Sequence, residues 1–268
     1  MHAVRSSIVA ALLALAVACG SDDGGETPAA SAPTGSPTRD VMAEPTVSGT
    51  FPVGGDQLVM RCWGTGAPAF LFEAGTDGSG LLAFPTALVR PLAEDHQACL
   101  YDRVGTGSSS QPVTPRRTID EVVGRLHRLL GKAGVEQPVV LVGQSGGGNL
   151  AVQYAARFGE GVAGLVLLDV PAPADDLGKE FPGAKAWRNP EHIDWVDAES
   201  RQARIRMPVG DFPVLVVTAT DGQSDEQDQS YWLDLSDHSE QVLMEGSHDI
   251  HEDDPEGVAE HIRAAFGG

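Results

Sequence analysis

Positively charged residues are scarce in this sequence of 268 residues. Lysine and arginine together number 18, against 38 aspartates and glutamates, so the formal net charge is −20. Such an excess of negative charge repels the phosphates of nucleic acids and anionic membrane surfaces. We also find no basic stretch with interleaved aromatic residues. The composition therefore argues against nucleic acid as a partner.

Long apolar runs are missing beyond the start of the chain. The apolar stretch at residues 8–17 follows Arg5 and is too short for a membrane-spanning helix, which needs about 20 residues. A charged residue followed by a short apolar stretch is typical of an export signal. Residues 1–19 therefore predict a signal peptide and an exported protein.

The end of this signal resembles the bacterial lipobox, in which a cysteine after a small residue is acylated and becomes the mature N-terminus. Cys19 follows Ala18, although Ala16 stands where a leucine is often found. We expect lipidation at Cys19, with plain secretion after an Ala-x-Ala-like site as the alternative. Contact with a membrane is then expected only through this N-terminal lipid.

Residues 20–44 are rich in Gly, Ser, Thr, Pro, Ala and Asp. Such a segment buries too little apolar surface to offset the entropy lost on ordering. It predicts a flexible tether that would span roughly 25–30 Å as a random coil. The folded domain is then expected over residues 45–268.

Cysteine is rare, with three residues in the whole chain, and no cysteine or histidine cluster has the spacing of metal ligands. We therefore expect no metal site, and we find no motif that implies a cofactor. Besides Cys19, the cysteines are Cys62 and Cys99.

Strand-like and helix-like segments alternate along the domain. Predicted strands cover residues 58–63, 69–73, 97–101, 139–142, 165–168, 214–217 and 240–244. Predicted helices cover residues 82–93, a segment opened by the capping box Thr118 to Glu121, residues 150–158, and a last helix from about 254. This alternation indicates an α/β fold whose mostly parallel sheet is covered on both faces.

The most informative motif is Gly143-Gln144-Ser145-Gly146-Gly147, which stands between a buried strand and a helix. A serine in this context occupies a sharp turn that lifts its hydroxyl above the sheet. Side chains two residues before or after it would collide with neighbouring backbone, which explains the glycines there. The motif therefore predicts Ser145 as a nucleophile.

With this motif in place, the chain from about residue 58 to 266 resembles the α/β-hydrolase family. Residues 73–76, 101–108 and 246–251 resemble, in order, the oxyanion loop, the Asp-x-Arg-Gly turn and the terminal histidine loop of that family. Glu73-Ala74 and Gln144 depart from its usual histidines, which affects substrate preference rather than the reacting groups. The resemblance implies an eight-stranded sheet with a short cap, which we expect over residues 171–211.

A serine nucleophile needs a base and an orienting carboxylate. His248 follows the last predicted strand and fits the chain order Ser, Asp or Glu, His, so we predict it as the base. For the acid we favour Asp221, at the end of the 214–217 strand. Asp169, at the end of the 165–168 strand, is the alternative, and Asp225 is a third candidate.

The resemblance also implies two backbone donors and one disulfide. The N–H groups of Gly146 and Thr76 would form the oxyanion hole. In the family's sheet the strands that hold Cys62 and Cys99 are antiparallel neighbours, and thiols outside the cytoplasm tend to be oxidised. We therefore expect a Cys62–Cys99 disulfide, with two buried free thiols as the alternative.

These expectations together predict a serine hydrolase that cleaves carboxylic esters through an acyl-enzyme, without a cofactor. Its partner would be a small-molecule ester or a related acyl substrate. Amide, peptide and thioester substrates remain open on the same residues, and the cap around Trp187 and Trp195 would shape the pocket. A different class, a surface lipoprotein that binds without turnover, also fits the sequence.

Overall fold

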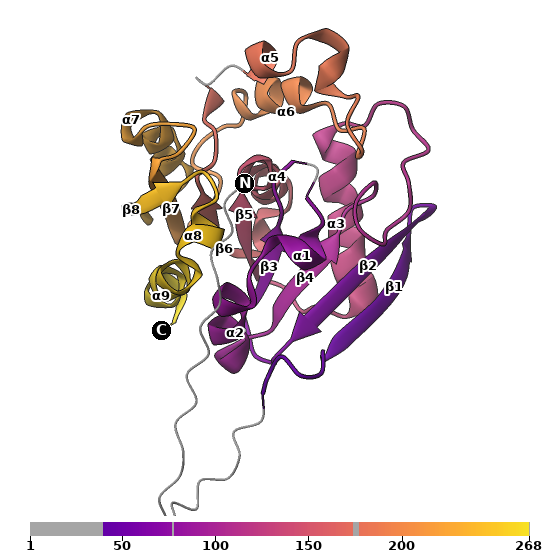
Figure 1. Cartoon of the computed structure of the whole chain (residues 1–268), viewed down its shortest axis with the longest axis vertical. Helices are drawn as coiled ribbons and strands as arrows, with labels where there is room; N and C mark the ends of the chain where they lie inside the picture. The colour runs from indigo at the N-terminus through magenta and orange to yellow at the C-terminus, as the bar shows by residue number, and fades with distance from the viewer. Residues whose placement is uncertain (1–39, 77, 174–176, 268) are drawn as a thin grey trace, which may run out of the picture. The chain divides into compact units, whose positions relative to one another are not determined.

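The computed structural model describes residues 40–76, 78–173 and 177–267. Within these residues eight strands form one sheet in the order β1-β2-β4-β3-β5-β6-β7-β8 (Figure 1). The strands are β1 (Val47–Val53), β2 (Asp56–Trp63), β3 (Ala69–Glu73), β4 (Ala98–Asp102), β5 (Val139–Gln144), β6 (Val162–Leu168), β7 (Val214–Asp221) and β8 (Ser239–Ser247). β2 runs antiparallel to β1 and β4, and the other neighbouring pairs are parallel. The expected mostly parallel sheet of eight strands is confirmed.

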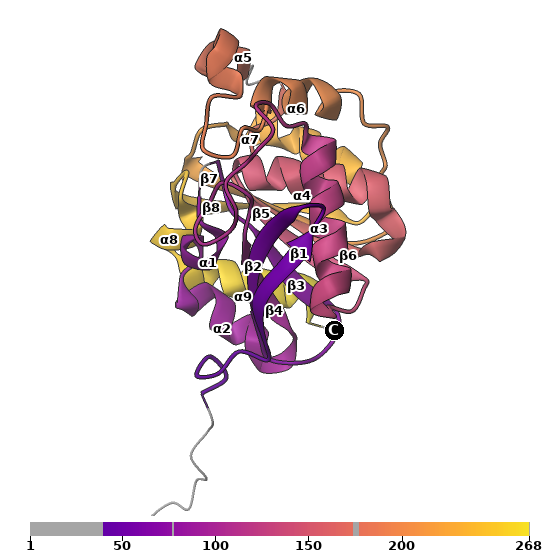
Figure 2. The ribbon, with the colours of Figure 1, turned by 90° about the vertical axis from the view of Figure 1, so that its right-hand side faces the viewer.

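Helices cover both faces of this sheet. They are α1 (Gly80–Ala83), α2 (Thr86–Asp95), α3 (Ile119–Ala133), α4 (Gly146–Phe158), α5 (Leu177–Glu180), α6 (Trp195–Gln202), α7 (Glu226–Gln229), α8 (Ile250–Asp253) and α9 (Pro255–Phe266). Short 3-10 helices cover Gly159–Gly161, Gly183–Ala186 and Ser230–Leu235. One apolar core contains side chains of α3 and α4, and a second contains side chains of α2 and α9. Figure 2 shows these layers from the side.

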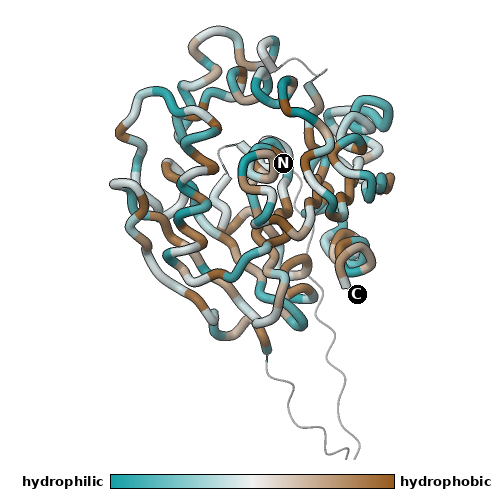
Figure 3. The backbone as a smooth tube through the Cα atoms, turned by 180° about the vertical axis from the view of Figure 1, so that it is seen from behind, coloured by the Kyte–Doolittle hydropathy of each residue, from teal (hydrophilic) through white to brown (hydrophobic). Residues whose placement is uncertain are grey.

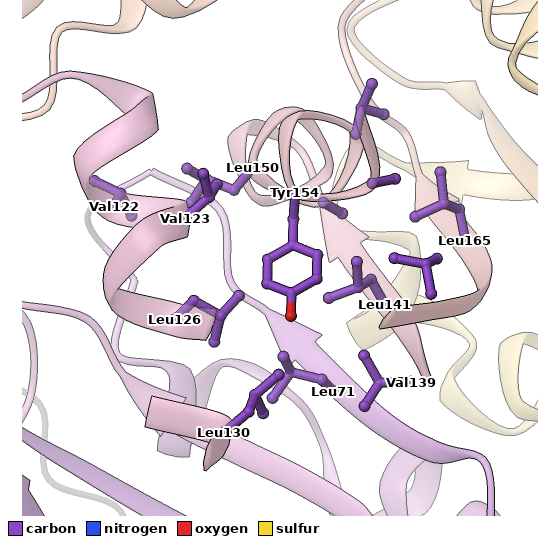
Figure 4. Close-up of a cluster of buried hydrophobic side chains, with 14 of the residues drawn as sticks. Leu71, Val122, Val123, Leu126, Leu130, Val139, Leu141, Leu150, Tyr154 and Leu165 are labelled. Atoms are coloured by element: carbon purple, nitrogen blue, oxygen red, sulfur yellow. The ribbon is translucent and has the colours of Figure 1, made fainter. Parts of the chain in front are cut away.

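The central strands are apolar because both their faces are covered. All six residues of β5 are buried, as expected of a parallel strand between two helical layers. Figure 4 shows Tyr154 of α4 among apolar side chains of α3 and of the strands β3, β5 and β6. The outer helices instead alternate hydrophobic and hydrophilic stretches (Figure 3), so each turns one stripe inward.

Helix α3 begins and ends where its sequence predicts. The Thr118 side chain accepts a hydrogen bond from the Glu121 N–H, and the Glu121 side chain accepts one from the Thr118 N–H. Gly134 ends the helix in the left-handed conformation, with φ of 71°, which costs glycine little because it has no Cβ. The predicted capping box is confirmed.

The helix predicted over residues 82–93 is in fact two helices, α1 and α2. Phe84 between them is extended, with φ of −113° and ψ of 125°. Proline clashes with a helical conformation of the residue before it, so Pro85 interrupts the helix at Phe84. The sequence analysis also missed β1, and residues 40–44, expected as the end of the tether, include Val41 and Met42 packed against the second apolar core.

Cys62 and Cys99 face each other across β2 and β4 and form the expected disulfide, with Cα atoms 4.0 Å apart. Both residues are fully buried. The bond joins two strands on the side of the sheet that carries the antiparallel pairs, and its cysteines are 37 positions apart in the sequence.

The segment between β6 and β7, which the sequence indicated as a cap, contains α5, α6 and the 3-10 helix Gly183–Ala186. Figure 1 shows α5 and α6 above the sheet. The predicted signal peptide, Cys19 and most of the tether lie outside the described residues. Of the residues described, no helix is both long and apolar enough to cross a membrane.

Candidate active site

Ser145 stands at the sharp turn between β5 and α4. Its φ of 51° and ψ of −129° lie in a backbone region that residues other than glycine rarely adopt. Its N–H donates to the Leu168 carbonyl at 3.1 Å, and its own carbonyl accepts from the Gly148 N–H at 2.9 Å. These bonds hold the strained residue in place, and strain of this kind is concentrated at functional sites.

The glycines around Ser145 are required by close backbone contacts. A Cβ on Gly147 would lie 2.2 Å from the Glu73 carbonyl oxygen. A Cβ on Gly143 would lie 2.5 Å from the Cα of Gly148. No side chain fits at these distances, so the elbow can form only with glycine at both positions, as the motif predicts.

His248 lies next to a buried carboxylate, that of Asp169. Nδ1 of His248 is 2.6 Å from Oδ2 of Asp169. The Asp169 side chain is fully buried, whereas that of His248 is 21% exposed. Asp169 also has a positive φ, 44°, which turns its carboxylate from the end of β6 toward the histidine loop.

The preference for Asp221 as the partner of His248 is corrected in favour of the alternative, Asp169. Asp221 is exposed at the end of β7. The chain that follows it wraps around the Asp169 carboxylate, because the Gln223 N–H donates to Oδ2 of Asp169 at 3.0 Å. A Cβ on Gly222 would lie 2.3 Å from that carboxylate. The end of β7 and the residues after it therefore donate hydrogen bonds to Asp169, and Asp169 rather than Asp221 contacts His248. Asp225 is excluded as well, since it is exposed and caps α7.

Gln229 is a site residue that the sequence analysis missed. It is fully buried in α7, and its Nε2 donates to Oδ1 of Asp169 at 2.6 Å. The Ala219 N–H donates to the same oxygen at 3.3 Å. These two bonds fix the direction of the carboxylate. No sequence motif marks Gln229, because its role depends on a contact 60 residues away.

Ser145 and His248 open onto one pocket of about 210 Å³. Its lining residues are Gly75, Thr76, Gln144, Ser145, Gly146, Pro171, Phe181, Trp195, Gln223, His248 and Asp249. Phe181 and Trp195 come from the segment predicted as the cap. Trp187 does not line this pocket and instead lies under the Arg116 guanidinium, 4.4 Å from it.

Gln144 occupies the space between the serine and the histidine loop. Its Nε2 lies 3.4 Å from Nε2 of His248 and donates to the His248 carbonyl at 3.3 Å. Within the described residues, no hydrogen bond joins the Ser145 hydroxyl to His248. Catalytic hydrogen bonds are often long in enzymes without substrate and tighten when substrate binds. Without substrate, Nε2 of His248 contacts Gln144 instead of Ser145.

The two predicted oxyanion residues lie beside each other. A Cβ on Gly146 would lie 2.8 Å from Cγ2 of Thr76 and 3.3 Å from the Trp195 ring. Gly146 is also the first residue of α4, where the helix dipole favours negative charge. Negative charge that develops between Ser145 and Thr76 would therefore be stabilised.

Beneath the oxyanion loop lies a fully buried charged cluster. Tyr101 donates to Oε1 of Glu73 at 2.6 Å, and Nη1 of Arg103 lies 3.4 Å from Oε2 of Glu73. Nε of Arg103 donates to Glu191 at 2.6 Å. Burial raises the pKa of Glu73 from 4.5 to about 7, against the lowering effect of Arg103. The same burial, with Glu73 nearby, raises the pKa of Tyr101.

Among the residues that the structure describes, no group of three or more His, Cys, Asp or Glu side chains could hold a metal ion. The site itself offers a serine hydroxyl, an imidazole beside a buried carboxylate, and backbone amides.

Comparison with known proteins assigns the fold. A family profile described as alpha/beta hydrolase fold matches residues 68–187. A serine hydrolase of carbazole degradation, CarC, superimposes with a TM-score of 0.63 at 19% identity, over 82% of this chain and 98% of its own. The chain therefore has the α/β-hydrolase fold, with an eight-stranded, mostly parallel sheet flanked by helices.

Two relatives by sequence are similar over different lengths. The protein YqjL of Bacillus subtilis is 26% identical over 72% of this chain and 81% of its own length. The proline iminopeptidase PfmaB of Pestalotiopsis fici is 32% identical, over 43% of this chain and 41% of its own. Together with the fold, such relatives support hydrolase activity, and they do not specify the substrate.

We expect the pH dependence of stability to change when Glu73 is replaced. Because the pKa of Glu73 is higher in the folded chain than its ordinary 4.5, the folded state binds this proton more tightly. The free energy of unfolding should then fall as pH rises from about 4.5 through about 7, by up to about 3 kcal/mol. In Glu73→Gln this loss should be absent, which urea unfolding at pH 5 to 8 measures.

The matched control is Glu136→Gln, since Glu136 is exposed. It should keep the pH dependence of the unsubstituted chain. If Glu73→Gln and Glu136→Gln showed the same dependence, the assignment of this titration to Glu73 would be wrong.

Proposed function

We propose that the chain is a serine hydrolase that cleaves carboxylic esters through an acyl-enzyme, with Ser145, His248 and Asp169 as its catalytic triad. The observation that carries this proposal is the pair formed by the buried Asp169 and His248, in which Nδ1 of His248 is 2.6 Å from Oδ2 of Asp169. His248 lines the same pocket as Ser145. A pair of this kind orients the imidazole to accept a proton from a serine.

In the proposed reaction, Ser145 Oγ attacks the ester carbonyl carbon while Nε2 of His248 takes the hydroxyl proton. Asp169 accepts the Nδ1–H hydrogen bond and stabilises the imidazolium. The N–H groups of Gly146 and Thr76 hold the oxyanion. His248 then gives its proton to the leaving alcohol, the C–O bond of the ester breaks, and water repeats the sequence to release the acid and restore Ser145.

The size of the pocket favours small acyl groups. Its volume of about 210 Å³ is below the roughly 300–1,000 Å³ of pockets that enclose drug-sized ligands. Trp195 limits it next to Gly146, because a Cβ on Gly146 would lie only 3.3 Å from the indole. A long acyl chain would have to displace Phe181 or Trp195 from the cap segment.

A second candidate is amide cleavage on the same residues. It is favoured by the similarity to PfmaB, which is named as a proline iminopeptidase. The first half-reaction would be the same, except that His248 would protonate a leaving amine. Amide and ester substrates can be told apart only by measuring how fast the chain hydrolyses each of them.

Substitution of the two aspartates should separate the acid from its rival. Asp169→Asn is expected to lower kcat on p-nitrophenyl acetate by about 10⁴, because an amide cannot stabilise the imidazolium or hold its tautomer. Asp221→Asn, the matched control, should stay within about twofold of the unsubstituted enzyme, since Asp221 is exposed. Equal effects of the two substitutions would contradict the assignment of Asp169.

A fluorophosphonate probe tests the proposed chemistry separately from the choice of substrate. Labelling should occur in the unsubstituted chain and disappear in Ser145→Ala. An unlabelled chain would instead point to a protein that binds without turnover.

Acyl length and leaving group should then show the substrate class. We expect kcat/KM to fall steadily from p-nitrophenyl acetate to long-chain p-nitrophenyl esters, because of the small pocket. Matched p-nitroanilides should react more slowly than esters. Faster turnover of anilides would overturn the ester proposal and favour the amide candidate.

We further propose that the protein is exported and anchored through a lipid on Cys19. Residues 1–19 and the tether that follows support this proposal by their sequence. The Cys62–Cys99 disulfide agrees with an oxidising compartment.

Labelled palmitate fed to a bacterium that expresses the full chain tests the anchor. The label should enter the unsubstituted protein and be lost in Cys19→Ala, whereas Cys62→Ala should keep it. Export without label would favour plain secretion.

A further inference from the structure

Arg103 is a buried arginine whose guanidinium contacts the backbone of the proposed oxyanion loop. Nη1 donates to the Ala74 carbonyl and Nη2 to the Gly75 carbonyl, each at 2.6 Å. Hydrogen bonds from a charged donor are roughly twice as strong as neutral ones. Arg103 therefore fixes two successive carbonyls at the end of β3, directly before Thr76.

The second of these bonds acts on the proposed oxyanion donor itself. The Gly75 carbonyl and the Thr76 N–H belong to one planar peptide group, in which they point in opposite directions. A bond that fixes the direction of the Gly75 carbonyl thus also fixes the direction of the Thr76 N–H. The positive charge also draws electron density toward the carbonyl oxygen, which makes the N–H a better donor.

The other side of the guanidinium is held by the cap segment. Nε and Nη2 of Arg103 donate to the two carboxylate oxygens of Glu191 at 2.6 and 2.7 Å. Glu191 is fully buried, and its carbonyl accepts from Arg117 at 3.0 Å. A Cβ on Gly105 would lie 2.3 Å from the Pro190 carbonyl oxygen, so the turn that carries Arg103 and the cap segment are in direct contact.

We propose that Arg103 is a positioning residue of the oxyanion hole, which aims the Thr76 N–H through the Gly75 carbonyl, and that Glu191 ties this arrangement to the cap. This inference rests on the proposed function for its catalytic consequence. Its geometric part, the orientation of one peptide group by one guanidinium, stands by itself.

The burial of the cluster supports a role beyond stability. Burying an ion pair costs several kcal/mol per charge and is seldom better for stability than apolar packing of the same volume. Arg103 is 3% exposed, and Nε, Nη1 and Nη2 all donate to protein acceptors. The charges of Arg103 and Glu191 cancel, and the raised pKa of Glu73, about 7, lets this second carboxyl group take up a proton near neutrality.

The test compares Arg103→Met with Arg125→Met in the full chain. Arg125 also pairs with a buried carboxylate, Asp56, at 2.6 Å, but it does not contact the oxyanion loop. We expect Arg103→Met to lower kcat on p-nitrophenyl acetate by roughly 10- to 100-fold, somewhat less than removal of a whole oxyanion donor. KM should change by less than about threefold, because the donor acts mainly in the transition state. Arg125→Met should leave kcat unchanged.

Two further measurements separate positioning from general damage. A trifluoromethyl ketone, which forms a tetrahedral adduct with a serine, should lose affinity for Arg103→Met by the same factor as kcat. The amide ¹H–¹⁵N signal of Thr76 should shift in Arg103→Met and not in Arg125→Met. Glu191→Gln leaves Arg103 and its hydrogen bond to the Gly75 carbonyl in place, so it should lower kcat less than Arg103→Met does. If Arg103→Met does not fold, Glu191→Gln serves as the test variant.

The outcomes decide between the two proposals. If the unsubstituted chain neither hydrolyses esters nor reacts with the fluorophosphonate probe, the proposed function fails, while the Thr76 signal still tests the positioning by Arg103. If kcat and the Thr76 signal of the test variant equal those of Arg125→Met, the positioning role is overturned. A rise in KM with unchanged kcat would also overturn it, since that pattern belongs to ground-state binding.

Discussion

The candidate site depends on one backbone constraint, the elbow at Ser145. Ser145 has a positive φ between a buried strand and a helix, and neighbouring backbone lies very close on both sides of it. Gly143 and Gly147 permit this approach, because any Cβ there would overlap the chain. The elbow thereby brings α4 against the end of β3, whose next residues form the proposed oxyanion loop. The position of the serine and the position of the loop that faces it are therefore set together.

The buried charges divide into two groups with different surroundings. Asp169 receives hydrogen bonds from Gln223, Gln229 and Ala219, all neutral donors, and it faces a partly exposed imidazole. Arg103 lies among carboxylates and carbonyls that exclude water. The first arrangement suits a charge that responds to proton transfer on His248, whereas the second suits a charge that stays fixed. The fold thus keeps the proposed catalytic pair, Asp169 and His248, apart from the fully buried pair of Arg103 and Glu191.

Sequence reasoning succeeded where a local rule leaves one solution. The glycine pattern located the elbow, the Thr118–Glu121 box located a helix start, and the chain order brought His248 to the site. It failed where the answer depends on tertiary contacts. Asp169 and Asp221 end adjacent parallel strands, so both occupy the right edge of the sheet. Only Asp169 contacts His248, because Asp169 turns inward with positive φ and the chain after Asp221 folds over it. No local pattern in the sequence records this difference.

The sequence predicts less about the structure of the cap than about any other part of the site. The cap nevertheless limits the pocket, because it contributes Phe181 and Trp195 to the lining. Trp195 packs against Gly146, while Glu191, a few residues earlier, holds Arg103. One short segment thus contacts both the proposed acyl pocket and the support of the oxyanion loop. A substrate that moved Trp195 would strain the segment that carries Glu191. In the proposed reaction, acyl-group size and the geometry of the oxyanion hole would therefore be coupled through the cap, and a poorly fitting acyl group would lose rate as well as affinity.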